Sequence, residues 1–220
     1  MTMSGGGEMI TLYDYILCDN CYKVRLLLAM LRVDYVPSKV NVHPGREGDT
    51  AAFRSLNPLG RIPVLTDDDL VLRDPQAILT YLALRYDAAR RWLPVEAARA
   101  GQVAMWLAFA ATELAPLSEL RMCRITSASG EAPDLPARAH AALTVLEDHL
   151  AEREIRGGAW IVGDVATIAD IAVFPPVALS ADGGIALERY PAVWRWIDRV
   201  KHLDGFIVMP GITPRLSATA

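Results

Sequence analysis

The sequence M-I-T-L-Y-D-Y at residues 9–15, followed by I-L-C-D-N-C-Y-K-V-R-L-L-L-A-M-L at residues 16–31, decides the fold. The first run is rich in β-branched and aromatic side chains, which predicts a strand. A short polar break at residues 17–20 separates that strand from a helix that begins at Cys21. Apolar residues recur in this helix at three- and four-residue spacing, which predicts one buried face formed by Val24, Leu27, Leu28 and Leu31.

The chain from this helix to Tyr86 supplies the rest of a small mixed sheet. Pro37 cannot donate a ladder hydrogen bond, so the strand that contains it is expected at a sheet edge. The aspartates at residues 67–69 separate two short apolar runs, which predicts a hairpin. The expected elements are a strand at 34–42, a helix at 51–56, strands at 63–66 and 70–72, and a helix from Pro75. Residues 9–86 therefore read as an α/β domain.

Only helices are expected after Tyr86. The segment 95–124 is Ala-rich and apolar on more than one side, which is typical of a central helix in a bundle. Thr167 and Asp170 form a capping-box pattern ahead of an apolar run. Further helices are expected at 133–155 and 191–200, the last with Trp194 and Ile197 as core candidates. We expect an all-helical domain over residues 95–209.

The composition excludes several classes of protein. The 220 residues carry 22 Lys and Arg against 26 Asp and Glu, a net charge of −4, so no broad positive field attracts nucleic acid or anionic lipid. The longest charge-free apolar stretch is about 13 residues, 100–112, which is too short to cross a bilayer. Residues 1–8 are Gly-rich and lack the pattern of a secretory signal. These features predict a cytoplasmic protein with no membrane partner.

Two of the three cysteines are the first candidates for chemistry. Cys18 and Cys21 lie in a C-x-x-C spacing between the first strand and the first helix, and Cys123 is alone. Backbone N–H groups at a helix N-terminus stabilise a thiolate over a thiol, so Cys18, which precedes the helix, is the candidate nucleophile. Cys21 is either a second reactive thiol or a small core residue. A metal half-site is the alternative, but the four histidines are scattered and supply no matching ligand pair.

Three motifs resemble the glutathione transferase family, in its bacterial cytosolic form. They are L-Y at residues 12–13 followed by N-C-Y-K-V-R-L-L at 20–27, L-N-P-L-G-R-I-P-V-L at 56–65, and T-I-A-D-I-A at 167–172. The resemblance covers nearly the whole chain, roughly residues 9–209. It implies a thioredoxin-like N-terminal domain joined to an all-α C-terminal helical bundle, with glutathione as cosubstrate, no metal, and a homodimer in the cytoplasm. A role in detoxification is also implied.

The resemblance also assigns a catalytic position. The family activates or bonds the glutathione sulfur through a Ser, Tyr or Cys just before the first helix, and that position is Cys18 here. The tyrosine-using classes place their tyrosine where this chain has Asp14, and Tyr15 stays an alternative only if the alignment slips by one residue. Ile62 and Pro63 match the family's cis-proline step, which would present the N–H and C=O of Ile62 to the tripeptide. Arg61 is either a solvated loop charge or a partner for a glutathione carboxylate.

One departure from the family lies at the γ-glutamyl end of the expected site. Asp74 keeps the acid that meets the ammonium group, but Pro75 replaces the Ser whose hydroxyl and N–H hold the carboxylate. Losing two hydrogen bonds to a charged group, at about 1.5 to 3 kcal/mol each, would weaken glutathione binding by tens of fold or more. Trp106, Phe109 and Arg121 are candidates for the second-substrate pocket, although core or surface roles suit each of them too.

These observations leave three functional readings. The leading one is a glutathione transferase-like enzyme that acts on electrophiles or mixed disulfides. A cysteine at the active position favours thiol transfer or reduction over aromatic conjugation, because exchange through a mixed disulfide is its natural chemistry. The second is a transferase-fold protein that binds a ligand or partner without catalysis, which Pro75 favours. The third is a dithiol oxidoreductase that uses Cys18 and Cys21 without glutathione.

Overall fold

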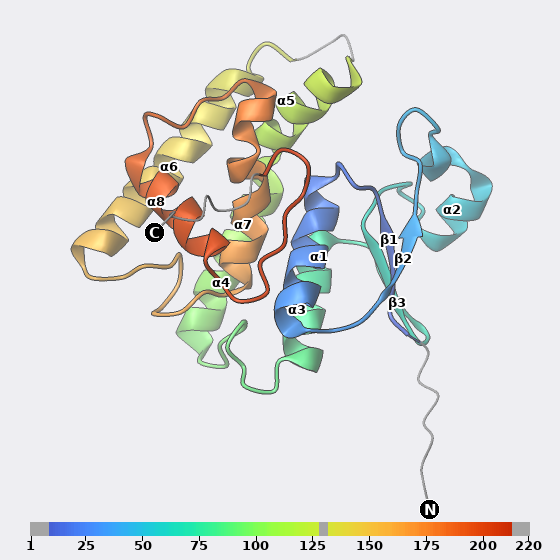
Figure 1. The fold of residues 1–220 in the computed structure, drawn as a ribbon, viewed down its shortest axis with the longest axis horizontal. Coiled ribbons are helices and arrows are strands. Elements are labelled where there is room, and N and C mark those ends of the chain that lie inside the picture. Colours follow the sequence, from blue (N-terminus) through green and yellow to red (C-terminus); the bar gives the residue numbers. More distant parts are fainter. Residues whose placement is uncertain (1–8, 128–131, 213–220) are drawn as a thin grey trace, which may run out of the picture.

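The computed structural model describes residues 9–127 and 132–212 (Figure 1). Its sheet has four strands in the order β2-β1-β3-β4, with β1 at Thr11–Asp14, β2 at Val36–Lys39, β3 at Val64–Asp67 and β4 at Leu70–Leu72. β2 pairs in parallel with β1 at the sheet edge, as Pro37 predicts, and the other pairs are antiparallel. Asp68 turns the β3–β4 hairpin with a φ of 48°, a left-handed conformation that aspartate tolerates better than most residues.

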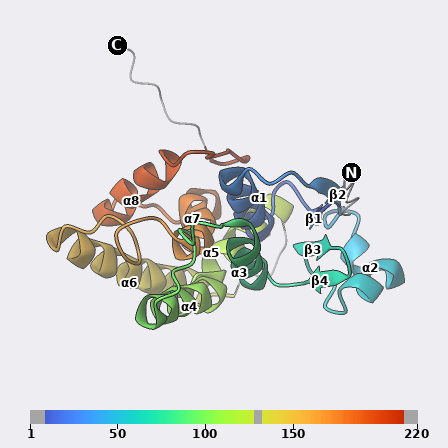
Figure 2. The ribbon, with the colours of Figure 1, turned by 90° about the horizontal axis from the view of Figure 1, so that it is seen from below.

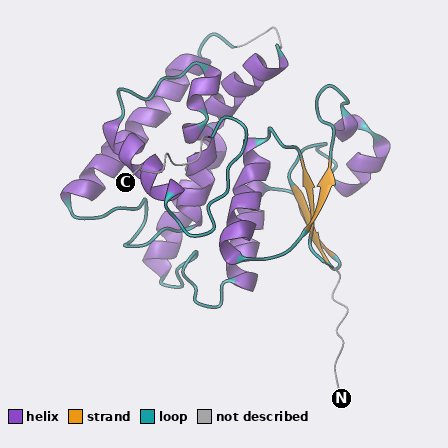
Figure 3. Ribbon diagram, in the orientation of Figure 1, coloured by secondary structure: helices purple, strands orange, loops and turns teal. Residues whose placement is uncertain are grey.

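Helices cover both faces of this sheet (Figure 3). α1 (Asp19–Leu31) and α3 (Pro75–Tyr86) pack side by side on one face, and both also contact α7 (Ile168–Ala178) of the helical part. The opposite face carries the one-turn helix η1 (Glu47–Asp49) and α2 (Ala51–Leu56). There Phe53 packs with Val40 and Val64, and its ring meets Tyr13 edge-on at 6.3 Å between centroids. The sheet is therefore covered by α2 on one side and by α1 and α3 on the other.

The rest of the described chain is helical, as the sequence predicts. It comprises α4 (Ala97–Thr112), α5 (Ala115–Thr126), α6 (Leu135–Ile155), α7 (Ile168–Ala178), η2 (Ser180–Gly183) and α8 (Pro191–Lys201). Seen from below, the sheet and α2 lie at one end of the molecule, and α6 and α8 lie toward the other (Figure 2). A small mixed sheet with helices is thus joined to a helical part, which is the architecture that the resemblance implies.

The single long helix expected over residues 95–124 is wrong, because the chain breaks between α4 and α5. Pro116 lies in the first turn of α5 and has no N–H to donate to the carbonyl four residues earlier, which interrupts the hydrogen-bond ladder at this break. By its length and apolar composition alone, the segment Ala97–Thr126 could span a membrane. However, 44% of its most apolar stretch is buried inside the protein, and core helices of soluble proteins often have this length and composition.

The expectation that α1 buries only one face is also wrong. Every residue from Cys21 to Leu28 is buried, including Lys23 at 1% and Arg25 at 7% exposure. The cause is tertiary, since α1 lies between the sheet and α7. Arg25 is compensated by an ion pair with Asp14 at the end of β1. Lys23 has no such carboxylate partner within 4.0 Å in the part of the chain that the structure describes.

The helical core is organised around Asp170. The predicted capping box is present, with Thr167 and Asp170 bonding each other's backbone at the start of α7. The same carboxylate accepts the indole N–H of Trp196 at 2.9 Å and the N–H of Ile161 at 3.2 Å. Trp196 and Ile197 are core residues, but Trp194 is 53% exposed, so its assignment to the core is wrong. The helical period of α8 directs Trp196 inward and Trp194 outward.

Candidate active site

A cavity of about 530 Å³ lies between the sheet domain and the first helices of the helical part. Its walls come from the start of α1, the loop before β3, the start of α3, and the facing parts of α4 and α5. Four residues selected from the sequence meet in it: Arg61, Ile62, Asp74 and Pro75. The opposite wall is built from small residues and two polar side chains, namely Ala110, Ala111, Ala115, Ser118 and Glu119.

The loop before β3 presents an unpaired peptide edge to this cavity. The Ile62–Pro63 peptide bond is cis, as the resemblance implies. In the described part of the chain, neither the N–H nor the C=O of Ile62 makes a hydrogen bond. The fully buried Asn57 holds the preceding turn in place by donating from Nδ2 to the carbonyl of Arg61 at 2.6 Å. The edge fits a ligand backbone that offers one donor and one acceptor.

The N-terminus of α3 forms the second wall and is already capped by its own chain. Asp74 Oδ1 accepts hydrogen bonds from the N–H groups of Gln76 at 2.9 Å and Ala77 at 3.0 Å. Pro75 has no N–H, and the N–H of Ile78 donates to the Asp74 carbonyl. The first turn of α3 therefore has no free N–H for a ligand carboxylate. The second carboxylate oxygen of Asp74 has no hydrogen bond in the described structure, so it can accept from an ammonium group.

Cys18 is the N-cap residue of α1 and is half-buried. Its sulfur accepts a weak hydrogen bond from the N–H of Cys21 at 3.4 Å, which places it over the positive end of the helix dipole. Cys21 is fully buried, and burial raises the pKa of its thiol well above the ordinary value, as does its hydrogen bond to Cys18. Cys18 does not line the 530 Å³ cavity, whereas Asn20, two residues later, does.

A polar network behind this cavity includes residues that sequence reasoning missed. The buried Lys23 ammonium donates to Asn20 Oδ1 at 2.7 Å. Asp19 accepts from the N–H of Asn20 at 2.8 Å and from the hydroxyl of Ser118 on α5, which links the two parts of the molecule. No signal in the sequence indicates this network, because a lysine between apolar residues of a helix usually reaches solvent.

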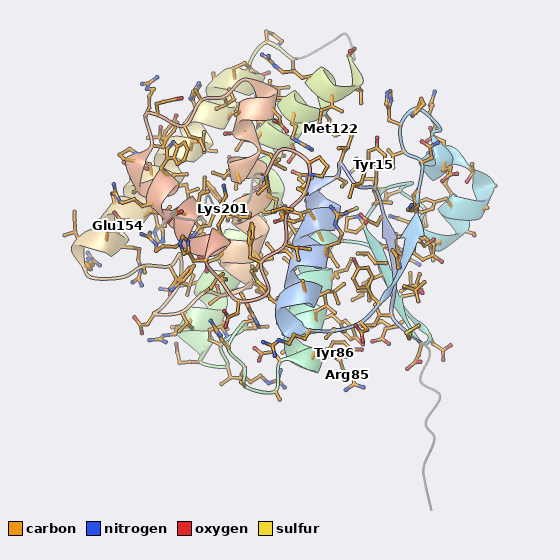
Figure 4. The ribbon with its side chains drawn as sticks, viewed as in Figure 1. Tyr15, Arg85, Tyr86, Met122, Glu154 and Lys201 are labelled. Atoms are coloured by element: carbon orange, nitrogen blue, oxygen red, sulfur yellow. The ribbon has the colours of Figure 1, made fainter. Side chains whose placement is uncertain are left out.

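The other residues selected from the sequence lie outside the cavity. Trp106 is 4% exposed and packs edge-on against Phe109, with 4.9 Å between ring centroids. Arg121 is 3% exposed and joins separate segments, since it donates to the carbonyls of Leu17 and Pro210 and pairs with Asp182 at 3.0 Å. Tyr15, labelled in Figure 4, donates to the carbonyl of His43 at 3.2 Å.

The described part of the chain contains no cluster of side chains suited to binding a metal ion. Among residues 9–127 and 132–212, no group of three or more His, Cys, Asp or Glu side chains converges in a way that could hold an ion. The residues that do converge suit an extended peptide-like ligand with an ammonium group. These are the Ile62 edge, the free oxygen of Asp74 and Asn20, whereas Cys18 lies outside the cavity lining.

Comparison with known proteins agrees with this geometry. Residues 12–90 match the family model of the glutathione S-transferase N-terminal domain, and residues 129–199 match that of the glutathione S-transferase C-terminal domain. The chain is 30% identical to a maleylacetoacetate isomerase of Pseudomonas aeruginosa over 193 residues, covering 85% of this chain and 89% of that protein. It is 29% identical to the glutathione S-transferase GstB of Escherichia coli, covering 87% of this chain and 93% of that protein.

Solved structures give the same result. The crystal structure of a glutathione transferase homologue from Lodderomyces elongisporus, which holds two glutathione molecules per subunit, superposes with a TM-score of 0.81 at 27% identity. That match covers 90% of this chain and 95% of the other. The likeness therefore spans both the sheet domain and the helical part. The chain belongs to the glutathione S-transferase family.

Proposed function

We propose that the protein is a glutathione-dependent thiol transferase in which Cys18 is the nucleophile. The main support for this proposal is the position of Cys18 as the N-cap of α1, where its sulfur accepts a hydrogen bond from the N–H of Cys21. The sulfur therefore lies at the N-terminus of α1, beside a backbone N–H group. In this proposal residues 9–86 bind glutathione and residues 95–209 shape the second-substrate site of a cytoplasmic homodimer.

The chemistry balances with glutathione alone. The Cys18 thiolate attacks the glutathionyl sulfur of a mixed disulfide, so that one S–S bond forms on Cys18 and the substrate leaves as a thiolate that takes up a proton. The thiolate of a second glutathione then attacks the Cys18 mixed disulfide. This step releases oxidised glutathione and restores the Cys18 thiolate. One disulfide is reduced while two glutathione units are joined in another.

The Ile62 edge and Asp74 support binding of the tripeptide in this scheme. The free N–H and C=O of Ile62 suit the backbone of the glutathione cysteine, and Asp74 Oδ2 suits the γ-glutamyl ammonium group. Arg61 lines the same cavity, and its guanidinium suits a terminal carboxylate of the tripeptide. The carboxylate at the γ-glutamyl end would be bound least well, because α3 has no free N–H in its first turn to donate to it.

Activity assays with single-cysteine variants test this proposal. Wild type should reduce the mixed disulfide that glutathione forms with 2-mercaptoethanol. The kcat/KM of Cys18→Ala for this substrate should be at least 100-fold lower. Cys123→Ala is the matched control, because Cys123 lies on α5 and should be replaceable without loss. Unchanged activity in Cys18→Ala would remove this residue from the mechanism.

Conjugation or isomerisation by a bound glutathione thiolate is the second candidate. The isomerase relatives favour it, and so does Asn20, a hydrogen-bonding side chain on the cavity wall. Under this alternative, Cys18→Ala keeps activity toward an aryl halide or a cis-enone acid while Asn20→Ala loses it. Calorimetry at millimolar glutathione separates these two enzymatic functions from a non-catalytic binding protein. For the binding protein we expect neither heat of glutathione binding nor turnover.

A further inference from the structure

The peptide group that joins Leu17 to Cys18 is bound by a side chain of the helical part. Arg121 of α5 donates from Nη1 to the carbonyl of Leu17. The N–H of the same peptide group, which belongs to Cys18, donates to the carbonyl of Tyr15 at 2.9 Å. Both polar atoms of this peptide group are therefore held, one by the local turn at residues 15–18 and the other by α5.

A second arginine binds the neighbouring carbonyl of the same turn. Arg25 of α1 donates to the carbonyl of Ile16 at 3.2 Å and pairs with Asp14 at the end of β1. This contact lies wholly within the sheet domain, because the turn, α1 and β1 all belong to it. The contact from Arg121 to Leu17, the next residue, adds a constraint from the helical part.

Arg121 is itself fixed by contacts on its other nitrogens. Its Nε pairs with Asp182 of η2 at 3.0 Å, and its Nη2 donates to the carbonyl of Pro210 at 3.4 Å. These segments pack closely, because a Cβ on Gly211 would lie 2.5 Å from Asp182 Oδ2. The guanidinium is planar and directs its donors in fixed directions, so three acceptors from three segments set its orientation. At 3% exposure, Arg121 is also shielded from solvent.

We propose that Arg121 is a positioning residue for Cys18, which fixes the turn before α1 relative to the helical part. The inference rests on the proposed function, because it concerns the same nucleophile. Arg121 does not line the 530 Å³ cavity, so it acts on the placement of Cys18 and not by contact with a ligand there. Because Arg121 also binds Asp182 and Pro210, the placement of Cys18 depends on how η2 and the segment at Pro210 pack.

Hydrogen exchange in the turn tests this placement without glutathione. Arg121→Met keeps an unbranched side chain of similar length and removes every donor. The hydrogen bond from the Cys18 N–H to the Tyr15 carbonyl should then open more often, so exchange of this amide, followed by NMR, should be at least tenfold faster. Arg121→Lys keeps the charge beside Asp182 and serves as the second variant if Arg121→Met does not fold. One ammonium cannot serve three acceptors in fixed directions, so exchange should again exceed that of wild type.

Arg153→Met is the matched control for losing a guanidinium that binds carbonyls. Arg153 of α6 donates to the carbonyls of Trp160 and Gly163 within the helical part. Its loss should leave exchange of the Cys18 amide at the wild-type rate. Equal exchange of this amide in the Arg121 and Arg153 variants would overturn the inference.

A kinetic comparison separates positioning from a purely structural role. In Arg121→Met, kcat for the mixed disulfide should fall at least tenfold, because a displaced nucleophile attacks less often in the right geometry. The Kd of glutathione, measured by calorimetry, should change less than twofold. A kcat at the wild-type value, or a fall in kcat matched by an equal loss of glutathione affinity, would overturn the inference. If wild type reduces no mixed disulfide, the proposed function fails, and the exchange rates alone decide whether Arg121 holds residue 18.

Discussion

The backbone N–H of Cys21 donates to the sulfur of Cys18 at 3.4 Å, so the cysteine before α1 caps the helix with its own side chain. Serine, threonine, aspartate and asparagine usually occupy this position, because oxygen is a stronger acceptor than a thiol sulfur. The cap at Cys18 is therefore weaker than an oxygen cap would be, and one contact joins this sulfur to the start of α1.

A stability comparison at residue 18 follows from this cap. Cys18→Ser replaces the sulfur with a better acceptor, whereas Cys18→Ala removes the acceptor, so the Ser variant should be more stable by about 1 kcal/mol. Both variants should lack thiol transfer. Urea unfolding at neutral pH measures the difference, and equal midpoints for the two variants would show that the sulfur does not cap α1.

Pro75→Ser is expected to tighten glutathione binding. Serine supplies an N–H and a hydroxyl at the first position of α3, where the proposed binding mode puts the γ-glutamyl carboxylate and the native chain has no free donor. One added hydrogen bond to a charged group, at about 1.5 kcal/mol, corresponds to roughly tenfold in Kd. Titration calorimetry measures the change against Pro37→Ser, a control on the exposed edge strand. A Kd no tighter than that of wild type would mean that glutathione does not use this end of α3.

Trp196→Phe should destabilise the helical part strongly. It removes the indole donor at 2.9 Å from Asp170, a carboxylate that is fully buried, and it leaves a void beside Phe174. The loss should be about 2 to 4 kcal/mol. Trp194→Phe on the same helix is the matched control, because Trp194 is 53% exposed and should cost less than about 0.5 kcal/mol. Equal losses in chemical denaturation would contradict this account of the Asp170 network.

Acid should weaken the contact between α6 and α8. Glu154, which lies at the outer end of α6 (Figure 4), pairs with Arg195 and Arg199, and these hydrogen bonds hold its pKa below the ordinary value of 4.5. A depressed carboxyl pKa stabilises the fold above about pH 4.5, and this stability is lost as the pH falls through the lower folded pKa.

The variant Glu154→Gln tests that sign. It should be less stable than wild type at pH 7, by up to about 1 kcal/mol for each partly exposed pair, and the gap should close below pH 4. Glu152→Gln, which removes an exposed pair with Arg156, is the control and should show a smaller gap. Thermal melts from pH 3 to pH 7 give the comparison. A gap that persists at pH 3 would mean that packing, and not charge, accounts for the loss.

Local pattern was enough to predict most elements and part of the site. Strand composition, the edge proline and the capping box each depend on a few neighbouring residues, and the structure confirms all three. The start of α3 at Pro75 was also found this way, since a helix start has a recognisable sequence. The cis Ile62–Pro63 bond was expected from the family resemblance, and the structure has it.

Features that depend on tertiary packing could not be predicted. Lys23 looks like a surface residue until α7 covers α1, and Arg121 looks like a pocket residue until Asp182 and two carbonyls occupy its guanidinium. The break before α5 was the exception, because Pro116 was visible in the sequence and the Ala-rich composition around it outweighed that signal.

The central claim is that Cys18 bonds covalently to glutathione, and intact-mass spectrometry after incubation with oxidised glutathione tests it most directly. Wild type and Cys123→Ala should each gain one glutathionyl group, and peptide mapping should place it on Cys18. Cys18→Ala should gain none at residues 18–21, since Cys21 is fully buried. An adduct found only on Cys123, or no adduct in a protein that still reduces mixed disulfides, would contradict the account.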